Sequence, residues 1–369
     1  MPDLTRRKLV RMLAAAPALA SLSADAQARR QTRNVFLVMT DGLRWQEVFG
    51  GADERLISKE NGVSDPDSLR REYWRDIPAA RREALMPFLW STIGQKGQIF
   101  GNRAAGSEVS VSNGLNFSYP GYNETLCGFS DPRIDSNDKI ANPNVTVFEW
   151  LHQKPDFRGR VAAFGAWDVF PFIFNAKRAG FPVNAGYDPL TTPPISPRLE
   201  FLNQLKSESK VWDDEAFDVF TFHTALEYVR AHTPRVLFLS LGETDEWAHD
   251  GKYAAYLYSA HRVDQAIAQL WKTAQTMREY RDRTTLIFTC DHGRGDNAVE
   301  WRSHGRKIPD SKDIWMAFLG PDTPPLGERR KTAPLQQNQV AATLAAVLGE
   351  DYPAAVAKAG APVADVLGQ

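Results

Sequence analysis

Cysteine, net charge and long hydrophobic runs are all scarce in this sequence of 369 residues. Cys127 and Cys290 are the only cysteines, which excludes a disulfide-stabilised scaffold and a cysteine-rich zinc module. The 44 basic and 45 acidic residues leave a formal net charge of -1, whereas proteins that bind nucleic-acid phosphates usually carry a basic excess. Since 43% of the residues are hydrophobic and 24% are charged, the composition indicates a globular protein of one large domain or two.

The first residues have the pattern of an export signal. A basic segment, Thr5–Arg11, contains two adjacent arginines and is followed by an alanine- and leucine-rich stretch. Small-x-small patterns within 24–28 are typical of a cleavage site, and the paired arginines resemble a twin-arginine signal. We therefore expect residues 1–28 to be a twin-arginine-like signal and residues 29–369 to be a periplasmic or secreted protein. The alternative is an uncleaved anchor, but the apolar stretch is shorter than the ~20 residues of a spanning helix.

Short apolar runs alternate with helical patterns along the rest of the chain. The predicted buried strands are Asn34–Thr40, Arg160–Phe164, Arg235–Leu241, Thr284–Cys290 and Asp313–Leu319. The predicted helices are Val145–His152, Asp213–Ala231, Tyr253–Glu279 and Leu335–Leu348. This alternation predicts an α/β fold with a mainly parallel central sheet and helices on both faces. Residues 170–210 are rich in Pro, Gly and Asn and fit no clean period, so we expect a small insertion or cap on a single domain, 29–369.

Three of the predicted strands run directly into acidic residues. Asp41 follows the first strand, Glu243 and Asp245 follow the third, and Asp291 follows the fourth. In open parallel sheets, ligands bind beyond the carboxyl ends of the strands, so we expect these acids to meet at one edge. Carboxylates brought together in this way repel each other unless a cation neutralises them. The strand ends therefore predict a cation site.

Three histidines accompany these acids. His249 lies four residues after Asp245, His292 is adjacent to Asp291, and His304 lies shortly downstream. Carboxylate and imidazole ligands without a thiolate suit zinc or manganese, and three of each are enough for two divalent ions. Each signal has a simpler explanation on its own, because an Asp-Gly after a strand is usually a turn and Asp-His-Gly is often a loop. Their joint occurrence at strand ends favours metal binding.

In this order and spacing, the residues resemble the metal ligands of the alkaline phosphatase superfamily. The chain is similar to the type I phosphodiesterases of that superfamily, which include nucleotide pyrophosphatases. The similarity extends from VFLVMTDG near the start to QVAATLAAVLGE near the end. The resemblance implies two divalent ions, with zinc as the first expectation and manganese as the alternative. The implied ligand sets are Asp245, His249 and His304 for one ion, and Asp41, Asp291 and His292 for the other.

The resemblance also implies a nucleophile. The segment Asn116–Glu124 is similar to the Thr-Phe-Pro-Asn motif of the phosphodiesterases and places Ser118 at the nucleophile. Pro120 suits the first turn of a helix, whose free N–H groups favour an incoming anion. A simple helix cap is the alternative role of Ser118, and Ser110 and Ser112 are rivals by proximity. In the same family an amide side chain further along the chain holds a phosphoryl oxygen, and Asn137 and Asn142 are both candidates.

The implied activity is hydrolysis of phosphoric esters through a phosphoserine intermediate. Some monoesterase relatives place cations after a strand like Arg160–Phe164, but here Gly165–Asp168 follows without Lys or Arg, which favours a diester. The basic residues that remain candidates to approach the site are Lys177, Arg178, Arg294 and Arg306. The motif at Ser118 lacks the arginine that sulfatases need for formylglycine formation, since Tyr122 takes that place.

Other activities of the same site stay open at this stage. These are phosphomonoesterase, phosphonate hydrolase and phosphotransferase activity, and a non-catalytic metal-binding protein is the remaining alternative. The expected partner is a small phosphoester substrate. Removal of residues 1–28 leaves a slightly acidic chain, so we expect neither nucleic acid as a stable partner nor a membrane after signal cleavage.

Overall fold

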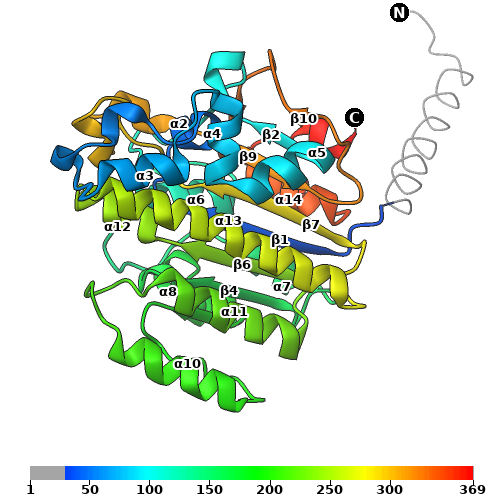
Figure 1. The fold of residues 1–369 in the computed structure, drawn as a ribbon. Coiled ribbons are helices and arrows are strands. Elements are labelled where there is room, and N and C mark those ends of the chain that lie inside the picture. The colour runs from blue at the N-terminus through cyan, green and yellow to red at the C-terminus, as the bar shows by residue number, and fades with distance from the viewer. Residues whose placement is uncertain (1–29, 369) are drawn as a thin grey trace, which may run out of the picture.

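An eight-stranded sheet forms the centre of the protein, and the computed structural model describes residues 30–368 of the chain (Figure 1). The strand order is β10-β2-β9-β7-β1-β6-β4-β5. The strands are β1 (Asn34–Thr40), β2 (Gln98–Phe100), β4 (Val161–Gly165), β5 (Val183–Ala185), β6 (Val236–Leu241), β7 (Thr284–Cys290), β9 (Met316–Leu319) and β10 (Gly327–Glu328). The strands from β7 to β5 are parallel, and β9 is antiparallel to both of its neighbours. The expected mainly parallel α/β fold is confirmed.

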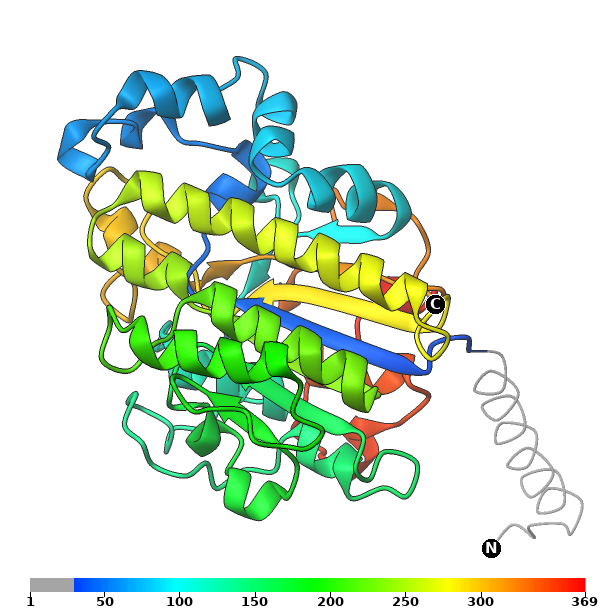
Figure 2. The same cartoon turned by 60° about the horizontal axis from the view of Figure 1, so that its bottom comes forward.

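Helices cover both faces of this sheet. The helices are α2 (Trp45–Gly50), α3 (Pro66–Tyr73), α4 (Pro78–Leu85), α5 (Gly94–Lys96), α6 (Ser118–Cys127), α7 (Val147–His152), α8 (Phe170–Ile173), α9 (Ala176–Ala179), α10 (Pro197–Glu208), α11 (Asp218–His232), α12 (Glu243–His249), α13 (Tyr253–Thr276), α14 (Gln339–Val347) and α15 (Tyr352–Ala355). Figure 2 shows α11 and α13 in front of the sheet. Helices α6, α7 and α14 pack together on the other face, where α14 contacts β1.

The central strands are buried along their whole length. Every residue of β1, β6 and β7 is buried, which explains why these strands read as continuous apolar runs. Burial of one Val, Leu or Phe side chain contributes about 1.5–3 kcal/mol, so these strands dominate the core. Cys127 and Cys290 are both buried and unpaired. The rigid centre fixes the positions of the loops that follow β1, β6 and β7.

Two segments differ from the sequence pattern. The single strand expected at Asp313–Leu319 is two strands, because β9 belongs to the main sheet while β8 (Asp313–Ile314) joins β3 (Val109–Ser110) and β11 (Leu335–Gln336) in a small second sheet. Trp315 lies between them, fully buried, and its indole N–H donates to the Leu43 carbonyl. An unbroken apolar run cannot reveal that a strand changes sheets.

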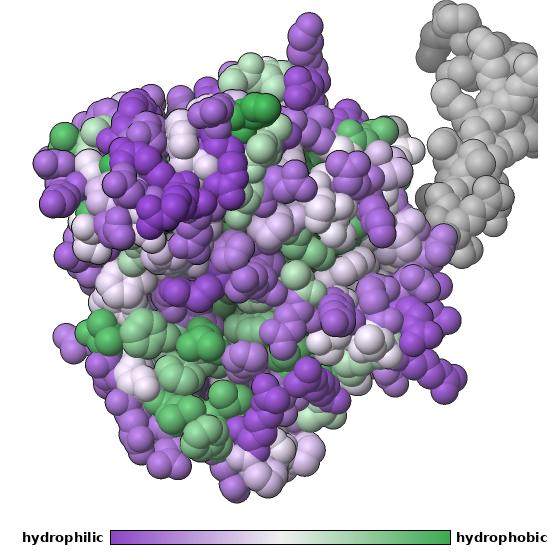
Figure 3. Space-filling view, viewed as in Figure 1, coloured by the Kyte–Doolittle hydropathy of each residue, from purple (hydrophilic) through white to green (hydrophobic). Residues whose placement is uncertain are grey.

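The segment 170–210 contributes to the main sheet as well as covering it. It supplies β5, which pairs with β4 at the sheet edge, and helices α8, α9 and α10. Most of the visible surface is hydrophilic, but hydrophobic side chains gather near α8 and α10 (Figure 3). Among residues 30–368, no helix has both the length and the apolar character to cross a membrane. The expected signal, residues 1–28, lies outside the described residues.

Candidate metal and catalytic site

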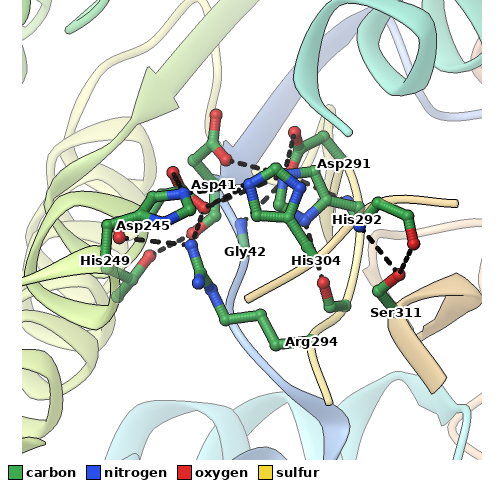
Figure 4. Close-up of polar contacts among 12 residues, drawn as sticks. Asp41, Gly42, Asp245, His249, Asp291, His292, Arg294, His304 and Ser311 are labelled. Atoms are coloured by element: carbon green, nitrogen blue, oxygen red, sulfur yellow. Dashed lines mark hydrogen bonds and ion pairs between the residues drawn. The ribbon is translucent and has the colours of Figure 1, made fainter. Parts of the chain in front are cut away.

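The six expected ligands meet at the carboxyl edge of the central strands (Figure 4). Because β6, β1 and β7 are adjacent and parallel, the residues that follow them are brought side by side. Helix α12 starts directly after β6, and its helical spacing places two ligands on one face. The ligands are Asp41 after β1, Asp245 and His249 on α12, Asp291 and His292 after β7, and His304 in the loop that follows.

Asp41, Asp291 and His292 form the first group. The Nε2 atom of His292 lies 3.2 Å from Oδ1 of Asp41 and 3.3 Å from Oδ2 of Asp291. These three atoms are buried and have no hydrogen-bond partner within residues 30–368. The other Asp291 oxygen accepts the backbone N–H groups of Gly42 and His292, so the structure holds its free oxygen toward the group. Three buried ligand atoms that face one another and lack hydrogen-bond partners fit a cation.

The proton on His292 is fixed by its second ring nitrogen. Nδ1 lies 2.9 Å from the Gly293 carbonyl oxygen, an acceptor, so Nδ1 donates its proton there. Nε2 then carries a lone pair directed at Asp41 and Asp291. A metal-binding histidine usually donates its other ring N–H to a carbonyl or carboxylate in this way, which fixes the orientation of the ring.

Asp245, His249 and His304 form the second group. Nδ1 of His304 lies 3.2 Å from the Asn116 carbonyl oxygen, which leaves its Nε2 free as an acceptor. That atom lies 2.9 Å from Nε2 of His249 and 3.7 Å from Oδ1 of Asp245. Two imidazole nitrogens in such close contact require a proton or a cation between them. His292 also reaches this group, with Nε2 3.8 Å from Asp245.

The charges of the site favour a cation strongly. Burial raises the pKa of Asp41 well above its ordinary value, and the neighbouring Asp245 raises it further. Burial and the charge of Asp41 do the same to the pKa of Asp291. Burial also lowers the pKa of His292 to about 4 and holds the pKa of His304 well below its usual range. Neutral imidazoles beside crowded carboxylates are the state that binds a divalent metal most readily.

Arg294 enters the site beside Asp245. Its buried guanidinium forms an ion pair with the Asp245 carboxylate and donates 2.7 Å to the Arg302 carbonyl oxygen. Burial alone would raise the pKa of Asp245, but the charges of Arg294 and His249 outweigh burial and hold it well below the ordinary value. Of the other basic candidates, Arg178 pairs with Glu149, at 2.8 Å. Arg294 therefore supplies one fixed positive charge to the site.

Ser118 is the first residue of α6 and is buried. Its hydroxyl has no hydrogen-bond partner within the part of the chain that the structure describes. The residue at the N-cap position is Phe117, so Ser118 does not cap the helix. Ser112, a rival in the sequence, instead donates its hydroxyl to Glu124 at 2.6 Å. The Ser118 hydroxyl is thus free for chemistry.

Three contacts hold α6 against the two ligand groups. Tyr122, one turn after Ser118, donates its hydroxyl to Asp41 at 3.0 Å. Gly121 packs so closely on the Asp291 backbone that a Cβ there would lie 2.4 Å from the carbonyl oxygen of Asp291. The Asn116 carbonyl, just before the helix, accepts from His304. The helix N-terminus therefore lies next to both ligand groups.

The two candidate amides have different surroundings. The side-chain oxygen of Asn137 accepts the Tyr119 backbone N–H at 3.0 Å, which places this exposed side chain beside the N-terminus of α6. Asn142 is fully buried, and its amide donates to Asn123 and to the Ile173 carbonyl, each at 3.1 Å. The structure brings Asn137 to Ser118 and keeps Asn142 in a core hydrogen-bond network.

Sequence reasoning missed two acids near the site. Burial and the charge of Glu246 raise the pKa of Glu215 well above its ordinary value, and one Glu215 oxygen is buried without a partner. Burial and the adjacent Asp245 raise the pKa of Glu246 to about 7. Glu215 does not follow a strand, so the pattern of acids at strand ends does not include it. Only the structure shows that it contacts Gly242 after β6.

Comparison with solved structures shows the fold. The alkaline phosphatase PafA is 11% identical, with a TM-score of 0.59 over 92% of this chain and 99% of that one. The phosphonate monoester hydrolase SpPMH from Silicibacter pomeroyi is 14% identical, with a TM-score of 0.57 over 92% and 77% of the two chains. A 2-O GAG sulfatase is 14% identical, with a TM-score of 0.54 over 91% and 74%. At these identities the similarity establishes architecture alone.

Comparison of sequences establishes the family. A search of curated proteins finds no match. The family model of type I phosphodiesterase / nucleotide pyrophosphatase matches residues 60–347, which is well over half of the chain. The match includes five of the six candidate ligands and Ser118, and Asp41 lies just before it. The chain therefore belongs to the type I phosphodiesterase/nucleotide pyrophosphatase family and is a hydrolase of phosphoric esters.

Proposed function

We propose that the protein is a metal-dependent phosphodiesterase that acts through a phosphoserine intermediate on Ser118. The observation that carries this proposal is the placement of a partnerless Ser118 hydroxyl next to buried, unpaired carboxylate and imidazole atoms. Unpaired buried polar atoms are costly, so a fold that gathers them beside a free hydroxyl favours a catalytic role. Family membership supplies the reaction class.

Two divalent ions fit the donor set. Asp41, Asp291 and His292 would hold one, and Asp245 and His304 with His249 would hold the other. All ligand atoms are oxygen or imidazole nitrogen, which suits zinc and, as an alternative, manganese. When bound, such ions supply positive charge at the phosphoryl and leaving-group oxygens and favour ionisation of a nearby hydroxyl.

The chain's own groups perform the remaining steps. The Ser118 oxygen attacks phosphorus in line and forms the Ser118–phosphate bond, while the bond to the leaving group breaks and the alcohol departs with the proton that Ser118 loses. The backbone N–H of Ser118 at the start of α6 would donate to a phosphoryl oxygen, and so would the side-chain N–H₂ of Asn137, whose oxygen already accepts from Tyr119. Water then attacks the phosphoserine from the side that the alcohol has left, which returns the proton to Ser118 and releases the second product.

A diester is the favoured substrate because the surroundings are acidic. The segment after β4 holds Asp168, whose carboxylate pairs with Lys139 at 2.6 Å, and Trp167, whose indole donates to Asp214 at 3.0 Å. Glu215 and Glu246 also lie near the ligand groups, since the charge of Asp245 raises the pKa of both carboxyl groups. A dianionic monoester meets more repulsion there than a monoanionic diester does.

Replacement of Ser118 tests the nucleophile. We expect Ser118→Ala to lower kcat by several orders of magnitude, since the covalent route is lost, while metal content measured by elemental analysis stays that of the parent. Ser112→Ala is the matched control, because it removes a hydroxyl from a neighbouring loop without touching the ligand groups. Near-parental activity of Ser118→Ala would contradict the proposal.

A substrate panel tests the reaction class. On metal-reconstituted protein we expect the highest kcat/KM on a chromogenic phosphodiester, with lower values on the matched monoester, phosphonate monoester and sulfate ester. A higher kcat/KM on the monoester or phosphonate would assign phosphomonoesterase or phosphonate hydrolase activity to the same site. Transfer of phosphate to an added alcohol faster than to water would identify a phosphotransferase.

A further inference from the structure

The amino ends of the central strands carry a row of arginines. Arg283, Arg33, Arg235 and Arg160 directly precede β7, β1, β6 and β4, which are neighbours in the sheet. Their backbones are linked in the same order, since Arg33 N–H donates to the Arg283 carbonyl at 2.8 Å and Arg235 N–H donates to the Arg160 carbonyl at 2.7 Å. The Arg235 side chain closes the row by donating to the Arg33 carbonyl at 2.9 Å.

Further arginines extend this row into a basic hollow. Arg278 and Arg281 follow the end of α13, and Arg30 lies where the described chain begins. Together with Arg33 and Arg283 they make up five of the seven residues that line a surface hollow of about 660 Å³. We call these five arginines, with Arg160 and Arg235, the arginine edge.

Asp282 is the one acid among the residues that line the hollow, so the positive charge of the arginine edge is only partly balanced there. Within residues 30–368, none of its seven guanidinium groups forms an ion pair with a carboxylate. Asp322 accepts the backbone N–H groups of Gln31 and Thr32 rather than a guanidinium group. Arg281 donates only to backbone carbonyls. Like charges at this density repel each other, so the edge is ready for an external anion.

Helix geometry explains only part of this row. Helix α13 ends at the arginine edge, and basic side chains just beyond a helix C-terminus interact favourably with its dipole. That effect accounts for Arg278 and Arg281. Arg33, Arg160 and Arg283 precede strands and receive no such stabilisation from a helix dipole.

We propose that the arginine edge binds the anionic phospholipid headgroups of a membrane surface. Guanidinium groups pair with phosphate in a planar, bidentate way, and clusters of basic residues next to a membrane segment bind anionic lipid. The chain enters the fold at this edge, at the right of Figure 1, while the strands run away from it toward the ligand groups. As long as residues 1–28 are not cleaved, the apolar stretch that ends at Leu22 stays within about 30 Å of Arg30, because an extended chain spans at most ~3.6 Å per residue.

This placement gives the protein an orientation. The arginine edge and the ligand groups lie at opposite ends of the same parallel strands, so a protein held by the edge presents Ser118 away from the lipid. The sequence-based expectation of no membrane partner rested on net charge and on the lack of a basic amphipathic helix, and net charge averages an acidic end and a basic end into a value near zero. The proposal is independent of the proposed function.

Vesicle sedimentation of the full chain tests the proposal. We expect binding to vesicles of phosphatidylcholine with a third of phosphatidylglycerol, and much weaker binding to phosphatidylcholine alone. The combined variant Arg278→Gln, Arg281→Gln, Arg283→Gln removes three exposed charges and should weaken binding to the anionic vesicles on the order of 100-fold. Residues 1–29 are common to every protein compared, so their contribution cancels.

A matched control carries the same charge change at the far end of the molecule. Lys59→Gln, Arg71→Gln, Arg75→Gln alters three exposed residues around α3, and we expect it to retain binding within about threefold. Equal loss in both variants, or equal binding of the parent to both kinds of vesicle, would overturn the proposal. A measurement on the parent alone gives a second test, because binding at the arginine edge must fall steeply as salt rises from low to high concentration.

Other anions are distinguished in the same assay. If the protein binds inorganic pyrophosphate or duplex DNA but no vesicles at low salt, the arginine edge binds a free anion or a nucleic acid and the lipid assignment is refuted. We expect instead that the protein binds the anionic vesicles and that pyrophosphate and DNA compete only weakly with them.

Discussion

The two ends of the central parallel strands carry opposite charge. At the carboxyl ends, Asp41, Asp245 and Asp291 meet in a buried site and are surrounded by further acids. At the amino ends, arginines stand in a row on the surface without carboxylate partners. Burial explains why only the acidic end needs partners within the protein. Buried charges must be paired or bind a metal, whereas water solvates exposed charges. The proposed catalytic site and the proposed docking surface thus lie at opposite ends of one sheet.

Loss of one buried carboxylate should have the largest effect. Asp41→Asn removes a charge from the first ligand group and should lower kcat/KM by about 10³ or more, because that group then binds its ion poorly. Arg281→Gln, a single change at the other end, should alter kcat/KM by less than about twofold. Comparable losses in the two variants would mean that the two ends are not independent.

Removal of the Arg294 charge should destabilise the metal-free protein more than the metal-loaded protein. Arg294→Met leaves Asp245 buried without its partner and should cost the metal-free protein about 3–5 kcal/mol of unfolding free energy. Bound metal replaces the missing charge, so the loss should be much smaller in the metal-loaded protein. Thermal unfolding with and without zinc measures both values. The same loss in both forms would show that Arg294 does not share Asp245 with a metal.

The two candidate amides should behave differently. Asn137→Ala should lower kcat/KM by on the order of 10²-fold and reduce the free energy of unfolding less than Asn142→Ala does, since it removes an exposed amide beside Ser118 and a single hydrogen bond to Tyr119. Asn142→Ala should leave catalysis by the folded protein nearly intact but reduce the free energy of unfolding by about 1–3 kcal/mol, because buried partners lose their hydrogen bonds. A reversed pattern would move the phosphoryl contact to Asn142.

pH should act on the two ends unequally. The pKa values of Asp41 and Asp291 are raised in the metal-free site, so these groups hold protons that an incoming metal must displace. Metal affinity should therefore rise with pH, by up to about tenfold per unit for each proton released, and level off above the raised pKa values. Arginines stay charged throughout, so vesicle binding should not change between pH 6 and 8. Calorimetry of zinc binding in two buffers measures the proton release.

The sequence predicted the carboxyl edge well because its signal is local. Asp41, Asp245 and Asp291 each follow a strand that reads as an apolar run, and parallel strands align their ends, so pattern and topology coincide. Ser118 was marked by the proline that starts its helix and by resemblance to the family motif. In the structure, ligand atoms of Asp41 and Asp291 lie close to His292, and Tyr122 on the helix of Ser118 contacts Asp41.

Other features could not be read from the sequence, for physical reasons. The distinction between Asn137 and Asn142 depends on which side chain the core saturates, and that is a tertiary property. The ion pair of Arg294 with Asp245 joins positions far apart in the chain. The strand expected over Asp313–Leu319 divides at Trp315 because the indole is anchored to the loop after β1.

The arginine edge was hidden by averaging. Net charge sums the whole chain, and only the alignment of strand starts shows that Arg33, Arg160, Arg235 and Arg283 are neighbours. In other parallel sheets, the charges of the residues that precede neighbouring strands can be compared in the same way. Charge asymmetry between the two ends of a sheet is therefore better evidence about partners than net charge is.

The central claim is that two divalent ions bind next to Ser118, and metal stoichiometry tests it most directly. Titration of metal-free protein with zinc, followed by calorimetry and elemental analysis, should give two ions per chain for the parent and for Ser118→Ala. Asp291→Asn should retain one, because it disables only the group with Asp41 and His292. A parent that binds no zinc or manganese, or one whose stoichiometry is unchanged by Asp291→Asn, would contradict the account.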